Sequence, residues 1–243
     1  MTLPALQKDV RIAWITLTLL LAGVLVGCQK APEYGRENTL FLPTDGPKIW
    51  AVAPAINLSG QRGIDPLIQA DLLFQQLQNV RGVTVVPVNR VVEVFVALRM
   101  REISSAEQGR LVCEQLGVDA LVVPTITIYS PYNPPKMGAS VQVFLRSREQ
   151  FDRIIDPREL ARQSTPDEIE ALPTQTDFLQ SAGMFDAADG SVRDAVALYA
   201  KGRTEIQGPL GDREYFLNMS RFSGFVWHEL IDDLIRKLPA EEK

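Results

Sequence analysis

The chain has 243 residues, 46% of them hydrophobic, and a formal net charge of −5. This length allows one domain of moderate size with appendages, or two small domains. An acidic chain gives no electrostatic basis for binding nucleic acids or anionic lipid headgroups. With 2 cysteines and 1 histidine, the sequence also offers few residues for a disulfide framework, a metal site or a nucleophile–base pair.

An uncharged apolar run of 15 residues, 12–26, follows a short segment that carries Lys8, Asp9 and Arg11. As a helix this run would measure roughly 23 Å, which is short for a hydrocarbon core of ~30 Å and typical of the apolar region of a signal peptide. It ends in Leu25-Val26-Gly27-Cys28, which resembles the lipobox of bacterial lipoproteins. The alternative interpretation is an uncleaved signal anchor.

The resemblance implies cleavage before Cys28, a thioether-linked diacylglycerol on its sulfur, and a fatty acid such as palmitate on the new amine. Several acyl chains, at ~0.8 kcal/mol per buried CH2, would hold the protein lastingly in a membrane. The next two residues, Gln29-Lys30, lack the aspartate that marks inner-membrane retention in such lipoproteins. The resemblance therefore favours the outer membrane, with the protein facing the periplasm.

Removal of residues 1–27 would leave 216 of the 243 residues and a net charge near −6, because the removed segment carries a charge of +1. Cys113 would then be the only unmodified thiol, which excludes an internal disulfide. Residues 28–47 contain several prolines and glycines among polar residues and predict a lipidated, flexible tether.

Alternating strand and helix patterns predict an α/β core domain over residues 48–146. The predicted strands cover 48–54, 83–88, 119–129 and 139–145, and the predicted helices begin at Pro66, at Arg90 and at the segment Ser104–Glu107. The order predicts a small, parallel-rich mixed sheet of about four to five strands, flanked by helices and ending in a hairpin. Pro87 indicates the end of its strand or an edge position.

Several helix ends have recognisable capping residues. Asp65 is the predicted N-cap of the first helix, Asn89 that of the second, and Ser104–Glu107 forms a predicted capping box for the third. Gly117 closes that third helix. Cys113 lies on its apolar face at helical spacing, which predicts a buried thiol that fills space in the core.

Two segments of this domain resemble a known family. The sequence WAVAPAINLSG, Trp50–Gly60, is similar to the "VAVLPFxNLSG" opening of periplasmic α/β modules, and LGVDALVV, Leu116–Val123, is similar to their "LGADALVVG". Such modules occur in the TolB amino-terminal domain, in the curli-secretion lipoprotein CsgG and in lipoproteins that activate peptidoglycan synthases. The resemblance covers about residues 48–145 and implies binding and assembly roles without a shared catalytic set.

The remaining sequence changes in character. Residues 147–180 mix charges with prolines and predict a polar, mobile insertion. Residues 184–190 indicate the end of a strand and its turn, and 192–201 a helix. Asp212 is the predicted N-cap of a long C-terminal helix that packs on the sheet. The predicted organisation is a signal peptide (1–27), a lipidated tether (28–47), the core domain (48–146), the insertion (147–180), a strand and helical segment completing the domain (181–238) and a tail (239–243).

Two motifs come close to known chemistry without matching it. His228-Glu229-Leu230-Ile231-Asp232 has an aspartate where the zinc-protease pattern requires a second histidine, which predicts a surface or packing histidine. Ser59–Gly63 precedes a helix in the manner of a phosphate-binding loop, but Asp65 places a negative charge where the phosphate would lie. The sequence therefore predicts no catalytic residues, no metal and no cofactor.

The loop between the last two strands of the core domain is the candidate partner-binding site. Its prolines stiffen the chain and its tyrosines offer rigid, amphipathic contact area. The candidate residues are Tyr129, Tyr132, Asn133, Pro134 and Pro135. The alternative is that the loop only connects two strands and packs on its own sheet.

The function expected from the sequence is that of a non-enzymatic, lipid-anchored binding or assembly module. Its expected partners are the membrane, through the lipid on Cys28, and another protein of the cell envelope, with no nucleic acid or small-molecule substrate. One alternative is a channel subunit of the curli-secretion type, which requires hairpins of alternating apolar and polar residues. Residues 147–179 do not alternate in this way. An enzyme of unknown class is the remaining alternative.

Overall fold

The computed structural model describes residues 39–43, 48–146, 178–201, 203 and 209–238. The chain divides into two units, Met1–Glu37 and Asn38–Lys243, and all described residues belong to the second unit. The leader, Cys28, most of the predicted tether, residues 147–177 of the predicted insertion and the tail lie outside the described residues.

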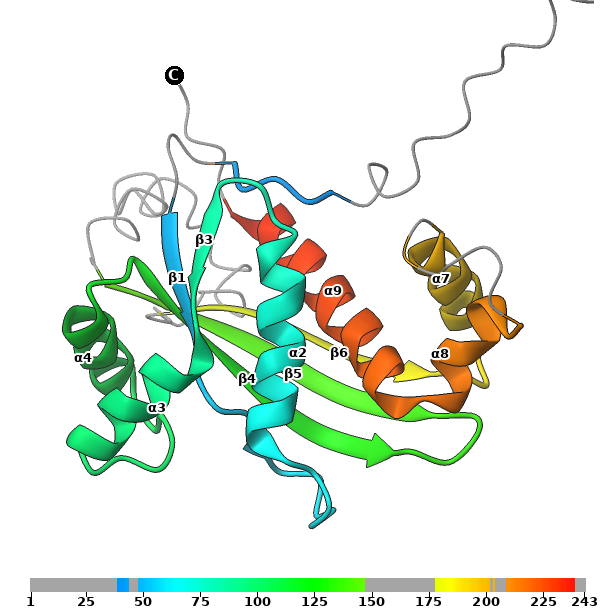
Figure 1. Cartoon of the computed structure of the whole chain (residues 1–243), viewed down its shortest axis with the longest axis horizontal. Coiled ribbons are helices and arrows are strands. Elements are labelled where there is room, and N and C mark those ends of the chain that lie inside the picture. Colours follow the sequence, from blue (N-terminus) through cyan, green and yellow to red (C-terminus); the bar gives the residue numbers. More distant parts are fainter. Residues whose placement is uncertain (1–38, 44–47, 147–177, 202, 204–208, 239–243) are drawn as a thin grey trace, which may run out of the picture. The chain divides into compact units, whose positions relative to one another are not determined.

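The centre of the fold is a six-stranded mixed sheet with the order β3-β1-β4-β5-β6, in which the short β2 pairs with β4 (Figure 1). Its strands are β1 (Lys48–Val52), β2 (Ile56–Asn57), β3 (Val83–Val86), β4 (Ala120–Ser130), β5 (Lys136–Leu145) and β6 (Phe178–Asp186). The pairs among β1, β2, β3 and β4 are parallel, whereas β5 and β6 add in antiparallel fashion. The predicted α/β class is confirmed, and β2 and β6 extend the expected sheet.

Helices cover both faces of this sheet. They are α2 (Pro66–Gln78), α3 (Val88–Ala97), α4 (Ala106–Leu116), α7 (Gly190–Ala200), the 3-10 turn η2 (Gly211–Arg213), α8 (Glu214–Leu217) and α9 (Met219–Lys237). Side chains alternate along a strand, so Trp50 and Val52 of β1 join one core and Ala51 joins the other. The first core contains α2, α7 and α9, and the second contains α3 and α4.

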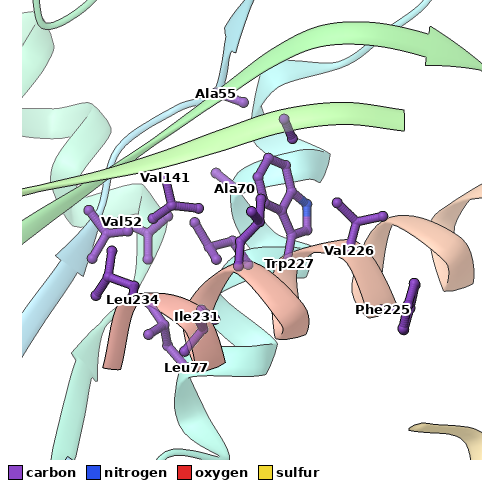
Figure 2. Close-up of a cluster of buried hydrophobic side chains, with 14 of the residues drawn as sticks. Val52, Ala55, Ala70, Leu77, Val141, Phe225, Val226, Trp227, Ile231 and Leu234 are labelled. Atoms are coloured by element: carbon purple, nitrogen blue, oxygen red, sulfur yellow. The ribbon is translucent and has the colours of Figure 1, made fainter. Parts of the chain in front are cut away.

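The larger core is built around α9. Figure 2 shows Trp227 between this helix and the strands, with Ile231 and Leu234 further along the same helix face. The indole Nε1 of the fully buried Trp227 donates a hydrogen bond to Gln69 Oε1 on α2 at 3.2 Å. A buried polar group without a partner costs free energy. A shift of α2 relative to α9 would break this bond and leave the indole unpaired, so the bond favours one relative position of the two helices. The predicted long C-terminal helix packed on the sheet is confirmed.

The smaller core depends on a close approach of α4 to β5. A Cβ atom on Gly109 would lie 2.6 Å from Cγ of Phe144, so only glycine fits there. Cys113 is fully buried on the same helix, and its Sγ lies 3.6 Å from the carbonyl oxygen of Phe144. Burial raises the pKa of this thiol to about 12. The predicted buried, space-filling cysteine is confirmed.

The predicted start of the first helix is confirmed, and the starts of three other predicted helices are shifted. The Asp65 carboxylate accepts hydrogen bonds from the amides of Leu67 and Ile68, as an N-cap should. However, α3 begins at Val88 with Pro87 in the N-cap position, not Asn89. Proline fixes the backbone at a suitable angle and needs no amide partner there, so the helix starts two residues early.

The other corrections concern α4 and the C-terminal helix. The N-cap of α4 is Ser105, which accepts from the Gln108 amide, so the capping interaction is shifted by one residue. In the C-terminal segment, Asp212 lies in the 3-10 turn η2, and the chain becomes extended at Asn218 before α9 begins. Asn218 caps α9 by accepting from the amides of Ser220 and Arg221. Asparagine favours caps over helix interiors, which explains the break.

Part of the predicted tether also belongs to the folded unit. Phe41 forms a parallel bridge with Arg81, just before β3, and Leu42 is buried against the larger core. Residues 39–43 therefore lie against the amino end of the sheet, and the segment before the fold is shorter than predicted.

Candidate functional site

The candidate site is the hairpin formed by β4 and β5. The two strands pair from Ala120↔Leu145 to Ser130↔Lys136, with a bulge between Ile126 and Ile128, and residues 131–135 form the connecting loop. Because β4 is 11 residues long, the loop lies about 36 Å along the strand from its start. Figure 1 shows this hairpin extending away from the start of β1.

The structure separates the five predicted contact residues into two groups. Tyr132, Asn133 and Pro134 are exposed, and Tyr132 most of all, at 79%. These three residues are called the tip below. In contrast, Tyr129 is half-buried and packs against the larger core, where burial raises the pKa of its hydroxyl. Pro135 is buried, so Tyr129 and Pro135 support the loop and leave the tip to make contacts.

The base of the loop is braced by residues distant in sequence. The carbonyl oxygen of Pro135 accepts a hydrogen bond from the Ala187 amide at 2.9 Å. Lys136 forms an ion pair with Asp186 at 2.5 Å, and its hydrogen bond lowers the pKa of the Asp186 carboxyl. Sequence reasoning missed these bracing residues, because only the pairing of β5 with β6 brings them together and no local pattern signals it.

Below the tip, one face of the sheet carries exposed apolar side chains. Ile128, Gly138 and Met184 are paired in one row across β4, β5 and β6, and Ile128 and Met184 are 39% and 63% exposed. A Cβ atom on Gly138 would lie 2.9 Å from Thr127 Oγ1 and 3.1 Å from Ile128 Cβ. The glycine thus lets the bulged strand place its side chains over β5.

His228 is a packing residue. It is 6% exposed, and its ring centroid lies 5.0 Å from that of Tyr199. Desolvation by burial, assisted by the charge of Arg203, lowers its pKa to about 4, so the imidazole is neutral at pH 7. Asp232, which stands at the position of the missing second histidine, pairs instead with Arg236 on the next helical turn. In the described part of the chain, no group of three potential metal ligands is found.

The turn over residues 57–63 is held by its own side chains. Asn57 Oδ1 accepts from the amide of Ser59 at 3.1 Å and from its hydroxyl at 2.7 Å. At the start of α2, the Asp65 carboxylate already accepts from two of the amides that a phosphate would need. The arrangement is that of a structural turn followed by a capped helix.

Cys28, the predicted lipidation site, lies outside the described residues, and its modification stays a prediction. Within the described ranges, none of the helices has both the length and the apolar character required to cross a bilayer.

No model of a protein family matches the sequence, and a comparison with curated proteins finds no match. Among solved structures, the chain is similar to lipoprotein GNA1162 from Neisseria meningitidis, with 19% identity over 42% of this chain and 74% of that one and a TM-score of 0.35. It is also similar to the LpoB C-terminal domain from Salmonella enterica, with 11% identity over 42% and 75% and a TM-score of 0.35. A third similar structure is the hypothetical protein CT253 from Chlamydia trachomatis, with 10% identity over 81% and 100% and a TM-score of 0.37. All three TM-scores lie below 0.5.

Proposed function

We propose that this protein is a lipid-anchored module that binds another protein of the cell envelope through the tip of its β4–β5 hairpin. The observation that carries the proposal is the tip itself. Tyr132 is 79% exposed at the end of a long hairpin whose base is fixed by a buried proline, an ion pair and a backbone hydrogen bond. An exposed aromatic side chain on a braced support loses little entropy on binding, as binding hot spots require.

The proposed role does not draw on the residues best suited to catalysis. The only histidine of the chain and the unmodified cysteine Cys113 are both buried, and both pKa shifts favour the neutral form. The anchor is the lipid expected on Cys28, which would place the module at the outer membrane facing the periplasm. Binding through a surface tip, rather than turnover in a pocket, is therefore the proposed activity.

Site-specific photocrosslinking in intact cells tests this proposal. A photoreactive amino acid replaces Tyr132 in one strain, and Val96 of α3, which is 72% exposed, in a matched control strain. We expect the Tyr132 position to form an adduct with one envelope protein and the Val96 position to form none with it. The adduct should be lost in a chain that also carries Cys28→Ser. Identical adducts from both positions, or none from the tip, would contradict the proposal.

A further inference from the structure

The segment just before β1 presents an aromatic side chain at the amino end of the sheet. The Leu42 amide donates to the Arg81 carbonyl oxygen at 2.9 Å, and the Arg81 amide donates to the Leu40 carbonyl oxygen at 2.8 Å. These two bonds hold the backbone on either side of Phe41. Leu42 points into the core, where its Cβ would lie 3.4 Å from a Cβ on Gly82. The Phe41 side chain is left 58% exposed.

The surroundings of Phe41 suit the boundary between water and lipid. The Arg81 guanidinium lies over the Phe41 ring, 5.1 Å from its centroid. Lys48 begins β1 next to the residue that follows Arg81, because its amide donates a hydrogen bond to the Gly82 carbonyl oxygen at 2.8 Å. An aromatic ring with a long basic side chain over it can enter the interfacial region of a bilayer while the cation stays at the headgroups. Phe41, Arg81 and Lys48 are called the entry surface below.

The entry surface and the tip lie at opposite ends of the sheet. Phe41 bridges Arg81, before the start of β3, and β3 and β1 run parallel to β4. β4 then runs from the level of Trp50 to the hairpin loop, and its 11 residues span about 36 Å. Figure 1 shows residues 39–43, in blue, beside the start of β1 and β3, with the hairpin at the far end of β4.

The position of the expected lipid selects between these two ends. Cys28 precedes Leu40 by 12 residues, a length of chain that spans at most about 40 Å when fully extended. For the tip to rest on the membrane, this segment would have to run almost fully stretched back along the sheet. If the membrane instead lies beside the entry surface, residues 28–40 can join the lipid to the folded unit without being stretched.

We propose that the entry surface contacts the bilayer that holds the lipid of Cys28, so that the Tyr132 tip points away from the membrane. The occupant of this surface is thus the lipid interface itself. The inference rests on the proposed function, because it needs the anchor on Cys28. It adds an orientation, in which the partner is met on the side of the module remote from the membrane.

Tryptophan quenching tests the orientation. Trp50 and Trp227 are 4% and 0% exposed. Among the tryptophans of the described residues, only one introduced at the surface could therefore be quenched by contact with lipid. The variants Phe41→Trp and Tyr132→Trp are prepared as the full lipidated chain and reconstituted in phosphatidylcholine vesicles, with and without bromine high on the acyl chains. After subtraction of the unsubstituted chain, we expect brominated lipid to remove emission from Phe41→Trp and to leave that of Tyr132→Trp unchanged.

Flotation of the same vesicles separates the two proposals. Co-flotation of both variants with unquenched emission at position 41, or with quenching at position 132, would overturn the orientation and leave the anchored module intact. A chain that does not float with the vesicles would overturn the anchor, and the orientation with it. A chain that starts at residue 28 with Cys28→Ser, and so lacks both leader and lipid, should neither float nor be quenched at position 41.

Discussion

The buried histidine predicts a specific dependence of stability on pH. His228 is 6% exposed, faces Tyr199 and is influenced by the charge of Arg203, and these surroundings lower its pKa from 6.5 to about 4. The unfolded chain therefore binds a proton between pH 6.5 and 4 that the folded chain does not bind. Stability from this residue is complete above pH 6.5 and is lost as the pH falls to about 4, by about 3 kcal/mol in total.

The measurement is urea unfolding of a lipid-free chain that starts at residue 28 with Cys28→Ser, followed by the fluorescence of buried Trp227. His228→Gln is the control, because it removes the titrating group and leaves every carboxylate in place. Between pH 7 and pH 4, the chain with His228 should lose about 3 kcal/mol more stability than the variant. Parallel stability curves for the two proteins would refute the assignment of a buried, neutral imidazole.

Three further predictions concern packing, reactivity and capping. Gly109→Ala should destabilise the fold by about 1 kcal/mol or more, because its methyl group overpacks against Phe144. The control Gly63→Ala should leave stability unchanged, because a Cβ there meets no atom within 4 Å. Thermal unfolding of the two variants measures the difference. The Cys113 thiol, with a pKa of about 12, should resist iodoacetamide at pH 8 in the folded chain and react in urea, as mass spectrometry would show. Asn218→Ala should cost about 1 kcal/mol by removing the cap of α9, and an unchanged urea midpoint would contradict that role.

The parts of the fold that sequence predicts well are those with a local cause. Asp65 followed by proline fixes the start of α2, and the apolar spacing around Cys113 predicts the buried face of α4. The parallel strands appear in the sequence as short apolar runs, because both faces of the sheet are buried there. Each of these features depends on residues a few positions apart, so the sequence contains the whole signal.

The features that sequence misses depend on distant residues or on competition between neighbours. β6 pairs with β5 across the intervening residues 147–177, and no local pattern indicates that partner. The break before α9 arises because Asn218 caps a new helix although the apolar stripe continues through it. In the candidate site, the loop itself could be predicted, but its division into an exposed Tyr132 and a supporting Tyr129 follows from how β4 packs on the larger core.

The entry surface illustrates the same limit. Residues 40–42 are an apolar patch in an otherwise polar segment. The same composition would fit a flexible tether or a segment that packs against a sheet, so composition alone does not distinguish the two. The docking requires the amide and carbonyl groups of Arg81, which become available only at the end of α2 and the start of β3. Hydrogen bonds between backbone groups do not depend on side-chain identity, so the sequence pattern does not predict them.

The intact mass of the mature protein extracted from membranes tests the lipid anchor on Cys28 more directly than any other measurement. We predict a chain that begins at Cys28 and carries a diacylglycerol and a further acyl group, with the corresponding Cys28→Ser chain retaining its leader and lacking both lipids. A membrane-derived protein that still begins with Met1, or that begins at Cys28 without added lipid mass, would contradict the anchor on which the proposed function depends.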